Sequence, residues 1–421
     1  MSYVPDTMRK RIYDKDNNQK IDIDVIPDLP RSKITDLFNS PFWDNIPDKP
    51  NIFRNIGFKV VDELPPTPED YEIVFYNGTP MFYDPNKGKW GKIQVVFESE
   101  GYSGFDNNGG GVWTKYINIP ITTSPSEYAQ YKVVIDSNNV TVYSVDGTQK
   151  TQGAVASDFW ANVKSDGLDI RVFDQAKEQL YFWIEEFDYS NMKAVIWVKL
   201  EAGSSELNIA YGNPSATKSD YENGEQVFEL FDDFTDGVID TSKYEYSGNV
   251  VEENGILTLR RSGSDAYIYT KQYFGNGYGV IAKSKIANTD NEWAVSFEGY
   301  IAGLADDFLV IRKYKSYSSS AWWLAVQDDS ATNRSTASYG TLDSDWHVFE
   351  ILWVSSSEAR FYIDGELAWT ATGANVPDGD NPLPVVWRVV ATEGAQTDVD
   401  WFGVFKLADP ADFGTPQILE F

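Results

Sequence analysis

Short runs of aromatic and β-branched residues, separated by turn residues, form the main pattern of the chain. Four of them follow one another between residues 167 and 214: GLDIRVFD, LYFWIE, AVIWVKL and IAYGNP. Runs of this length that alternate with turn signals are typical of strands in a β-sandwich. The four runs contain acids, an arginine and several aromatics, but neither cysteine nor histidine. The pattern therefore predicts a module that holds a surface in shape rather than one that carries out chemistry.

The same pattern continues to the end of the chain. Strand candidates beyond residue 226 include AWWLAVQD, HVFEILWV and EARFYIDGELAW, and no long amphipathic helix interrupts them. Aromatic residues make up 15% of the chain, and such side chains favour pleated, half-buried surfaces. We predict an all-β chain in which two tandem β-sandwiches occupy residues 112–225 and 226–421.

The N-terminal part of the chain has a different character. Residues 1–60 are polar and repeatedly interrupted by proline, which removes a backbone donor and clashes with the preceding helical turn. A segment this irregular cannot bury enough surface alone. We therefore expect residues 1–60 to anchor the protein and promote its oligomerisation. Residues 61–111 predict a small β-meander followed by a flexible Gly/Asn hinge, GFDNNGGG at 104–111.

Charge and rare residue types exclude several classes of function. The formal net charge of −29 repels nucleic acid phosphates and anionic membranes, so we expect neither as a partner. The absence of cysteine excludes disulfides, thiolate zinc sites and cysteine nucleophiles. The single histidine, His347, removes most general-base mechanisms. It lies in DWHVFEILW, where alternation predicts a strand and a structural role.

The sequence shows no targeting or membrane segment. Its first residues lack the apolar core of a secretory signal, and no run of eighteen apolar residues could form a transmembrane helix. We therefore expect synthesis in the cytoplasm of a host cell and departure by assembly into a particle.

One group of oxygen ligands near the N-terminus has the spacing of a calcium loop: Asp14, Asp16, Asn18 and Asp22. Gln19 stands where that loop has its turn glycine, and Val25 where it has a bidentate glutamate. A solvated acidic turn is therefore the alternative. A second pair, Asp398 and Asp400, shares one face of the last predicted strand and could bind a cation or pin that strand. Calcium at these places is the only cofactor that the sequence suggests.

The chain lacks the acid pattern of a β-sandwich glucanase. Such an enzyme places its carboxylates at alternate positions of one strand, as in E-x-D-x-x-E, and no such string occurs. The acid doublets Asp232–Asp233 and Asp306–Asp307 would point to opposite faces of a strand. We expect no enzymatic activity.

Two consecutive tryptophans mark a candidate binding site in SSSAWWLAVQDD. Trp322 and Trp323 cannot both face one core from a strand, so one must meet a loop, a ligand, a partner chain or the other sheet. Gln327 and Asp328 add hydrogen-bonding groups beside them. We interpret these four residues as a candidate glycan site, with interface or loop packing as the alternative.

The runs GLDIRVFD, LYFWIE, AVIWVKL and IAYGNP resemble, in this order, a domain of unknown function that is common in archaeal and viral surface proteins. No catalytic residues are established for that family. Residues 228–408 are similar to concanavalin A-like, laminin G-like jelly rolls, through FELFDDF, HVFEILWVSSSEARFYIDGELAWT and VDWFGVFK. The resemblance implies a sandwich of two curved sheets used for glycan or protein binding. Its glucanase members carry the acid motif that this chain lacks.

The N-terminal segment YDKDNNQKIDIDVIPDLP and the hairpin IVFYNGTPMFYDPNKGKW resemble parts of phage and archaeal-virus tail-fibre or spike proteins, which are usually trimeric. These resemblances imply a virion structural protein, a tail fibre, spike or turret subunit, displayed as a homotrimer on the virion surface. Its N-terminus would contact other virion proteins, and its sandwiches would attach to a host-surface glycan or protein.

Three alternatives stay open. The chain could be a cellular surface adhesin or surface-layer component, which requires an export route. It could be an architectural capsid or filament protein without a receptor, because both uses favour stable sandwiches with acidic exteriors. Polysaccharide hydrolysis is the alternative that the missing acid motif disfavours.

Overall fold

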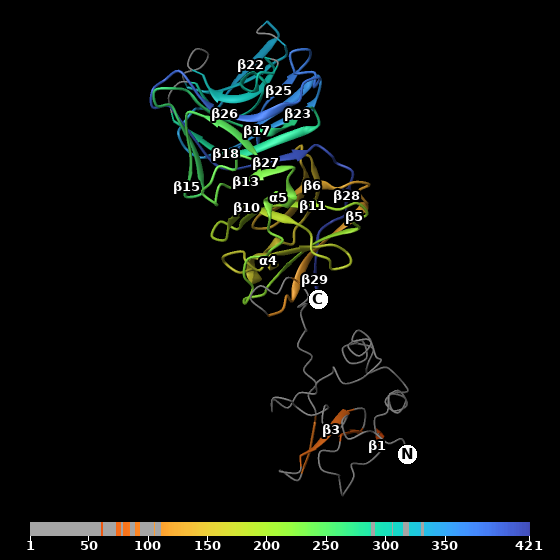
Figure 1. Ribbon diagram of the computed structural model, residues 1–421. Coiled ribbons are helices and arrows are strands. Elements are labelled where there is room, and N and C mark those ends of the chain that lie inside the picture. The colour runs from red at the N-terminus through yellow and green to blue at the C-terminus, as the bar shows by residue number, and fades with distance from the viewer. Residues whose placement is uncertain are drawn as a thin grey trace. The chain divides into compact units, whose positions relative to one another are not determined.

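The computed structural model describes Phe105 and residues 111–287, 291–304, 306–314, 320–329 and 332–421, and it gives the backbone of four short strands between residues 60 and 92. The chain divides into two compact units, Met1–Glu100 and Gly101–Phe421. Nearly all regular structure is β, which confirms the predicted all-β fold class (Figure 1). Within the described residues, no helix has the length and apolar character needed to span a membrane.

The first unit contains one small sheet. Its strands, in sheet order, are β1 (Val60–Val61), β2 (Ile73–Tyr76), β3 (Thr79–Asp84) and β4 (Lys89–Lys92). Strands β2, β3 and β4 pair antiparallel at the three places where the sequence predicts strands. Strand β1 adds a parallel partner to β2, which local turn signals do not indicate.

Phe105 lies within the segment that the sequence assigns to a flexible hinge. Its ring is buried and packs edge-on against Trp113, with the two ring centroids 5.2 Å apart. It also contacts Phe173 and Phe421, at 5.0 and 5.8 Å between ring centroids. Phe105 therefore belongs to the core of the second unit. A local run of glycine and asparagine could not reveal this, because two of its partners lie far along the chain.

The second unit begins with a β-sandwich of two sheets. One sheet has the order β10 (Phe182–Asp188), β11 (Lys193–Leu200), β6 (Ala129–Ile135), β7 (Val140–Ser144) and β8 (Gln149–Gly153). The other sheet contains β5 (Lys115–Thr123), β12 (Glu206–Tyr211) and β9 (Arg171–Phe173), together with two short C-terminal strands. Alternating burial explains the packing: Tyr131, Val133 and Ile135 of β6 face Ile117 of β5 in one continuous core. Helix α4 (Ala156–Asn162) buries Phe159 in the same core.

The end of the chain returns to this first sandwich. Strands β28 (Asp412–Phe413) and β29 (Gln417–Glu420) both pair antiparallel with β5. In Figure 1 the C-terminal segment runs from the second sandwich back along the first. The sequence assigns residues 226–421 to the second sandwich as a whole. The structure instead assigns the last strands to the first.

The second sandwich consists of an eight-stranded and a seven-stranded antiparallel sheet. The eight-stranded sheet runs β15 (Asn249–Glu253), β16 (Ile256–Arg260), β27 (Gln396–Lys406), β18 (Tyr278–Ile286), β23 (His347–Ser355), β24 (Glu358–Ile363) and β25 (Glu366–Thr372), with β13 (Leu230–Asp232) paired to β27. The seven-stranded sheet runs β14 (Tyr244–Ser247), β17 (Ala266–Phe274), β26 (Leu383–Val389), β19 (Glu292–Glu298), β20 (Phe308–Lys313), β21 (Trp322–Gln327) and β22 (Arg334–Tyr339). Consecutive strands are often not neighbours, so the connections cross between sheets.

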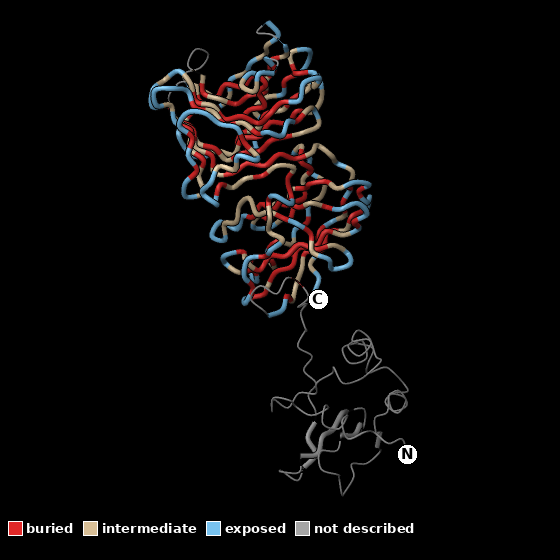
Figure 2. The backbone as a smooth tube through the Cα atoms, in the orientation of Figure 1, coloured by how far each residue is buried: buried red, intermediate tan, exposed pale blue. Residues whose placement is uncertain are grey.

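The inner faces of these two sheets form the largest core of the protein. Phe297, Leu309 and Leu324 of the seven-stranded sheet face Phe349 and Phe402 of the eight-stranded sheet. Buried residues fill the interior of both sandwiches, and exposed residues lie on their loops (Figure 2). The predicted tandem sandwiches are therefore present, and the second has the two-sheet architecture that the jelly-roll resemblance implies.

An aromatic interface joins the two sandwiches. Short helix α5 (Gly224–Val227) and β13 lie at the junction. The ring centroids of Trp183 and Trp401 are 4.6 Å apart, and those of Trp197 and Phe405 are 5.2 Å apart. Phe228 packs between the sandwiches against Trp197, at 5.1 Å. Large buried rings dominate packing energetics, which explains why residues 101–421 form one compact unit.

Candidate functional site

The outer face of the seven-stranded sheet, the face turned away from the eight-stranded sheet, carries the candidate site. Every second residue of a strand points to this face. Strand pairing sets three rows side by side: a first row of Tyr267, Arg388, Trp293, Arg312 and Trp323, a middle row of Val386, Ser296, Val310 and Ala325, and a third row of Glu298, Phe308, Gln327 and Arg334. The middle row has small or medium side chains. The longer side chains of the other two rows therefore stand on either side of it.

The first row alternates arginine with aromatic rings. The guanidinium of Arg312 lies 4.3 Å from each of three ring centroids, those of Trp293, Trp323 and Tyr314. The guanidinium of Arg388 lies 5.3 Å from the Trp293 ring. Aromatic faces attract cations at these distances. The rings therefore hold the two guanidinium groups against the sheet.

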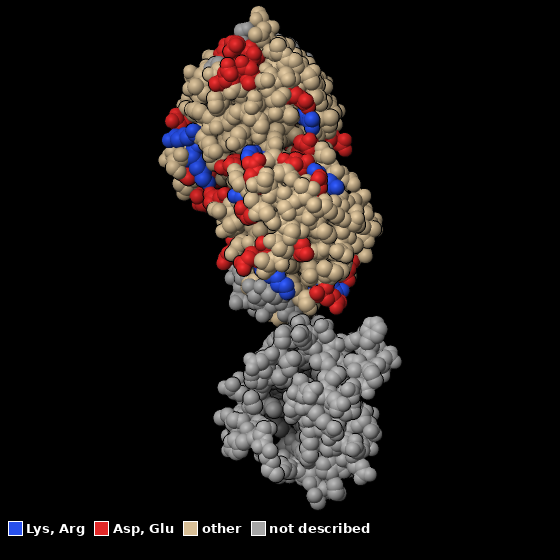
Figure 3. Space-filling model, turned by 90° about the vertical axis from the view of Figure 1, so that its right-hand side faces the viewer, with Lys and Arg blue, Asp and Glu red and all other residues tan. Residues whose placement is uncertain are grey.

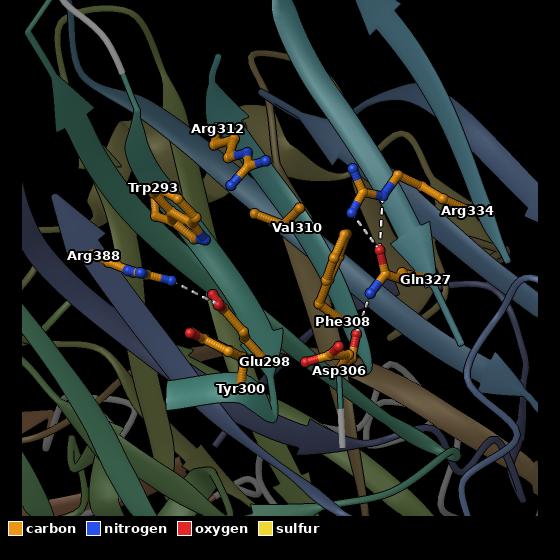
Figure 4. A pocket seen from close by; sticks show the side chains of 10 residues that line it. All are labelled: Trp293, Glu298, Tyr300, Asp306, Phe308, Val310, Arg312, Gln327, Arg334 and Arg388. Atoms are coloured by element: carbon orange, nitrogen blue, oxygen red, sulfur yellow. Dashed lines mark hydrogen bonds and ion pairs between the residues drawn. The ribbon is translucent and has the colours of Figure 1, made fainter. Parts of the chain in front are cut away.

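The third row is linked by hydrogen bonds. Arg388 Nη1 donates to Glu298 Oε1 at 3.2 Å from one side of the pocket (Figure 4). From the other side, Arg334 Nε donates to Gln327 Oε1 at 2.8 Å, and Gln327 Nε2 donates to the Asp306 carbonyl at 2.6 Å. These bonds fix the orientation of polar groups around an open space.

The space between the rows is a pocket of about 230 Å³ with Val310 among its lining residues. Phe308 lies on the third-row side, and Tyr300 of the 3-10 helix η3 (Tyr300–Ala302) lies beyond the end of β19. Tyr300 is 60% exposed, so it can contact a bound molecule without leaving a core. The pocket thus combines aromatic surface with several hydrogen-bonding groups in fixed positions.

Burial shifts the pKa of two charged groups in the pocket. It lowers the pKa of Arg312 to about 10, although the charge of Glu298 acts in the opposite direction. Burial raises the pKa of the Glu298 carboxyl, and the charges of Arg388 and Arg312 oppose that shift. The pocket therefore holds three arginines and two acidic residues, the buried Glu298 and the exposed Asp306.

The structure brings together only part of the predicted glycan site. Trp323 belongs to the first row and Gln327 to the third. Trp322 points the other way, into the core, where its ring lies 4.8 Å from Phe349. Asp328 follows the end of β21 and does not line the pocket. Consecutive strand residues point to opposite faces, which separates the two tryptophans.

Asp328 belongs instead to a cluster of three carboxylates with Asp307 and Asp329. One carboxylate oxygen of each lies within 4.8 Å of the others. The backbone N–H of Asp329 donates to Asp307 Oδ1 at 2.6 Å. Burial, followed by the charges of neighbouring acids, raises the pKa of both Asp307 and Asp328, while backbone hydrogen bonds oppose the shift. These three oxygens could hold a hard divalent cation such as calcium.

The other predicted metal ligands have different surroundings. Asp398 accepts hydrogen bonds from Thr258 Oγ1 at 2.9 Å and from Gln396 Nε2 at 2.8 Å. Asp400 pairs with Lys283 at 2.6 Å, at a point where the pairing of β18 and β27 shifts register. These contacts fit the alternative that the pair pins the last long strand. Asp14, Asp16, Asn18 and Asp22 lie outside the described residues.

A second, open pocket of about 490 Å³ lies over β15, β16 and β27. Asp398, Arg260 and Trp346 are among its lining residues. Trp346 is 37% exposed. Because this pocket lies on the eight-stranded sheet, substitutions of its residues can serve as controls for substitutions in the first pocket.

Sequence reasoning missed most residues of the first pocket. Trp293, Arg312 and Arg388 lie in EWAVSFE, DFLVIRK and VVWRVV. The available signal was an arginine inside an otherwise apolar strand, which burial alone disfavours. The pairing of β19 with β26 was not available, because these strands lie almost ninety residues apart.

His347 has the structural role that the sequence predicts. Its two ring nitrogens lie 2.6 Å from Asp364 Oδ2 and 2.8 Å from Asp343 Oδ1. Burial alone would lower the pKa of His347, but the hydrogen bonds and charges of these two acids raise it overall. The imidazole thereby ties the hairpin turn at Asp364 to the start of β23.

The run GLDIRVFD also has a structural role. The Asp169 carboxylate is fully buried and accepts hydrogen bonds from the backbone N–H of Gly212 at 2.7 Å and of Asn213 at 3.2 Å. Arg171 donates to the carbonyl of Thr217 at 2.9 Å and stacks on Trp113. These side chains clamp the loop after IAYGNP. These bonds all go to backbone groups.

Comparison with solved structures finds β-rich carbohydrate-related proteins at low identity. A structure described with endo-acting O-glycanases of human gut microbiota that initiate mucin breakdown has 16% identity and a TM-score of 0.36, and the match covers 43% of this chain and 100% of that one. Porphyranase B from Zobellia galactanivorans has 16% identity and a TM-score of 0.34, over 43% of this chain and 91% of that one. A pseudo-β-1,3-glucanase of Mycobacterium tuberculosis, described as an immunostimulatory antigen, has 17% identity and a TM-score of 0.36. The match covers 44% of this chain and 99% of that one.

Sequence comparison gives one local match. No curated protein sequence matches the chain. Residues 166–247 match a family described as Domain of unknown function (DUF2341). The matched range begins at the Asp169 clamp and extends past α5 into the first strands of the second sandwich. It therefore includes part of the aromatic junction between the two sandwiches.

Proposed function

We propose that the chain is a display protein that binds a surface glycan through the pocket between the first and third rows. The pocket carries the proposal, because it combines Tyr300 and Phe308 with arginine, glutamine and carboxylate groups held by hydrogen bonds. Ligand sites commonly pair apolar and aromatic walls with a few fixed polar groups. Sugar rings offer apolar faces and hydroxyl groups that match both features.

Two sandwiches in one compact unit suit display. The aromatic interface fixes the second sandwich to the first, so the pocket has a defined place on the unit. We propose a virion fibre, spike or turret as the setting, with residues 1–60 forming a homotrimer. Weak contacts at single pockets gain avidity when several copies act together. A cellular adhesin would use the same pocket in the same way.

Polysaccharide hydrolysis is the second candidate. Its supporting observation is Glu298, a pocket carboxyl whose pKa burial raises, as in a general acid. Binding is favoured because Glu298 already pairs with Arg388 at 3.2 Å. Release of reducing ends from a glycan panel, lost in Glu298→Gln, would show that hydrolysis takes place.

A glycan array with two matched variants tests the binding site. Tyr300→Ala removes an exposed ring from the first pocket, and Trp346→Ala removes one from the second pocket. We expect Tyr300→Ala to weaken binding about fivefold, which corresponds to the loss of one stacking contact of roughly 1 kcal/mol. Trp346→Ala should bind as the wild type does. Loss of binding in Trp346→Ala alone would contradict the proposed site.

A further inference from the structure

The first row suggests which chemical group a glycan would bring to the pocket. Arg312 and Arg388 lie on either side of Trp293, and Arg334 faces them from the third row. Only Glu298 and Asp306 oppose these three cations among the lining residues. A net positive pocket is unusual on a chain with a formal charge of −29. On the face drawn in Figure 3, both sandwiches carry patches of acidic side chains and fewer basic ones.

The two arginines of the first row also have unmet hydrogen-bonding capacity. The Nε groups of Arg312 and Arg388 are buried and have no hydrogen-bond partner among the described residues. A buried donor without an acceptor, on a charged group, destabilises the free protein. Aromatic rings rather than carboxylates surround Arg312. Arg388 already pairs with Glu298, so Arg312 is the group that lacks a paired anion in the part of the chain that the structure describes. An anion in the pocket would supply that partner, and the planar guanidinium matches carboxylate and sulfate geometry.

The neighbouring acids leave room for such an anion. The carboxylate cluster of Asp307, Asp328 and Asp329 lies near the third row, at the end of β20 where Phe308 begins the strand. Arg312 is four residues further along β20, or about 13 Å at the usual rise of a strand. This separation exceeds the Debye length of about 8 Å at physiological ionic strength, so distance and salt both weaken the repulsion between the acidic cluster and an anion at the first row, with less screening than on an open surface. The pocket therefore has an acidic end and a basic end.

We propose that the pocket selects an acidic glycan, whose carboxylate or sulfate group binds Arg312 and Arg388 while its ring lies over Val310 toward Phe308 and Tyr300. This inference rests on the proposed glycan-binding function and specifies its ligand class. The shared chemistry is a planar or tetrahedral oxyanion on a sugar, and the two sources are a uronic acid and a sulfate ester. Neutral sugars would leave the Arg312 guanidinium among aromatic rings, without an ion-pair partner among the described residues.

Titration calorimetry with matched glycans tests this selection. One arm uses an oligogalacturonate and its neutral methyl ester, and the other uses a chondroitin sulfate oligosaccharide and its desulfated form. We expect the acidic member of at least one pair to bind about tenfold or more tightly than its neutral counterpart, since charge-assisted hydrogen bonds are about twice as strong as neutral ones. The pair that shows the difference identifies the oxyanion.

Three variants test whether the preference for the acidic glycan depends on Arg312. Arg312→Gln should remove the preference for the acidic member, and Arg312→Lys should retain part of it because the charge stays but the fork of donors is lost. Arg260→Gln, in the second pocket, is the matched control and should change nothing. Equal affinity for both members, with Tyr300→Ala still weakening binding, would overturn the acidic selection but leave the glycan site intact. Absence of binding to every member would overturn both proposals.

Discussion

The charge of a single residue, Glu350, makes the interface between the two sandwiches sensitive to pH. It lies on β23, and the charged groups that influence it, Lys132, Glu185 and Asp146, all belong to the first sandwich. Burial raises the pKa of Glu350 to about 7. Lys132 opposes this shift, and Glu185 and Asp146 add to it. The carboxylate therefore becomes charged inside the interface when the pH rises above the acidic range.

The sign of the pH effect follows from linkage. The pKa of Glu350 is higher in the folded than in the unfolded protein, so its stabilising contribution is complete below pH 4.5 and is lost as the pH rises to about 7. Glu350→Gln removes this titration. We expect the variant to be more stable than the wild type at pH 8 by on the order of 3 kcal/mol, and by much less at pH 5. Urea unfolding at the two pH values measures the difference in free energy of unfolding between the variant and the wild type. A difference of equal size at both pH values would contradict the raised pKa of Glu350.

For Trp322 and Trp323, the sequence predicts that the two side chains point in opposite directions, but it does not predict the contacts of Trp323. Alternation correctly implies that the two rings cannot share one core, and Trp323 does lie on the outer face. The sequence could not say that Arg312 fills the space above it. That contact depends on β20 lying beside β21, which the pattern within either strand does not contain.

At the scale of elements, the C-terminal return completes the first sandwich. Lys150 of β8 pairs with Asp409 at 2.9 Å and with Asp412 at 3.2 Å. Phe413 packs edge-on against Tyr131, with ring centroids 4.9 Å apart. The first sandwich is thus built from both ends of the second unit. It includes strand pairs between residues about three hundred positions apart.

Phe413→Ala tests this return. Phe413 is 9% exposed, so its truncation should lower the free energy of unfolding by about 3 kcal/mol through the cavity it leaves. Leu419→Ala on β29 is the matched control, since Leu419 is 37% exposed and the change should stay within about 0.5 kcal/mol. Hydrogen exchange should rise in β5 and β12 in the Phe413 variant. A rise confined to the seven-stranded sheet would show that the last strands serve the second sandwich instead.

Local patterns account for the strands but not for their partners. Period-2 alternation and turn residues predict the strands of both sandwiches and the meander of the first unit. The segment ADFGTPQILEF contains glycine and proline and only short apolar runs, so it gives a weak strand signal. Its pairing with β5 follows from the non-local core around Phe105 and Phe421. No local pattern shows such a contact.

At the scale of the whole molecule, most surface charge is acidic while one pocket is basic. A surplus of acidic side chains favours solubility and repels anionic membranes. The first pocket acts only at short range, because salt screens distant charges. The fold class follows from composition and alternation. The pocket does not, because it requires the relative placement of β26, β19, β20 and β21, which lie in a different order along the chain.

A crystal structure of the second unit soaked with the tightest-binding glycan is the most direct test of the central claim. The account predicts density for a sugar ring across β19 and β20, with an oxyanion within hydrogen-bond distance of Arg312 or Arg388 and the Tyr300 ring against the sugar. The Tyr300→Ala protein, soaked in the same way, should show weak or no density there. Density at Trp346 on the eight-stranded sheet, with the first pocket empty, would contradict it.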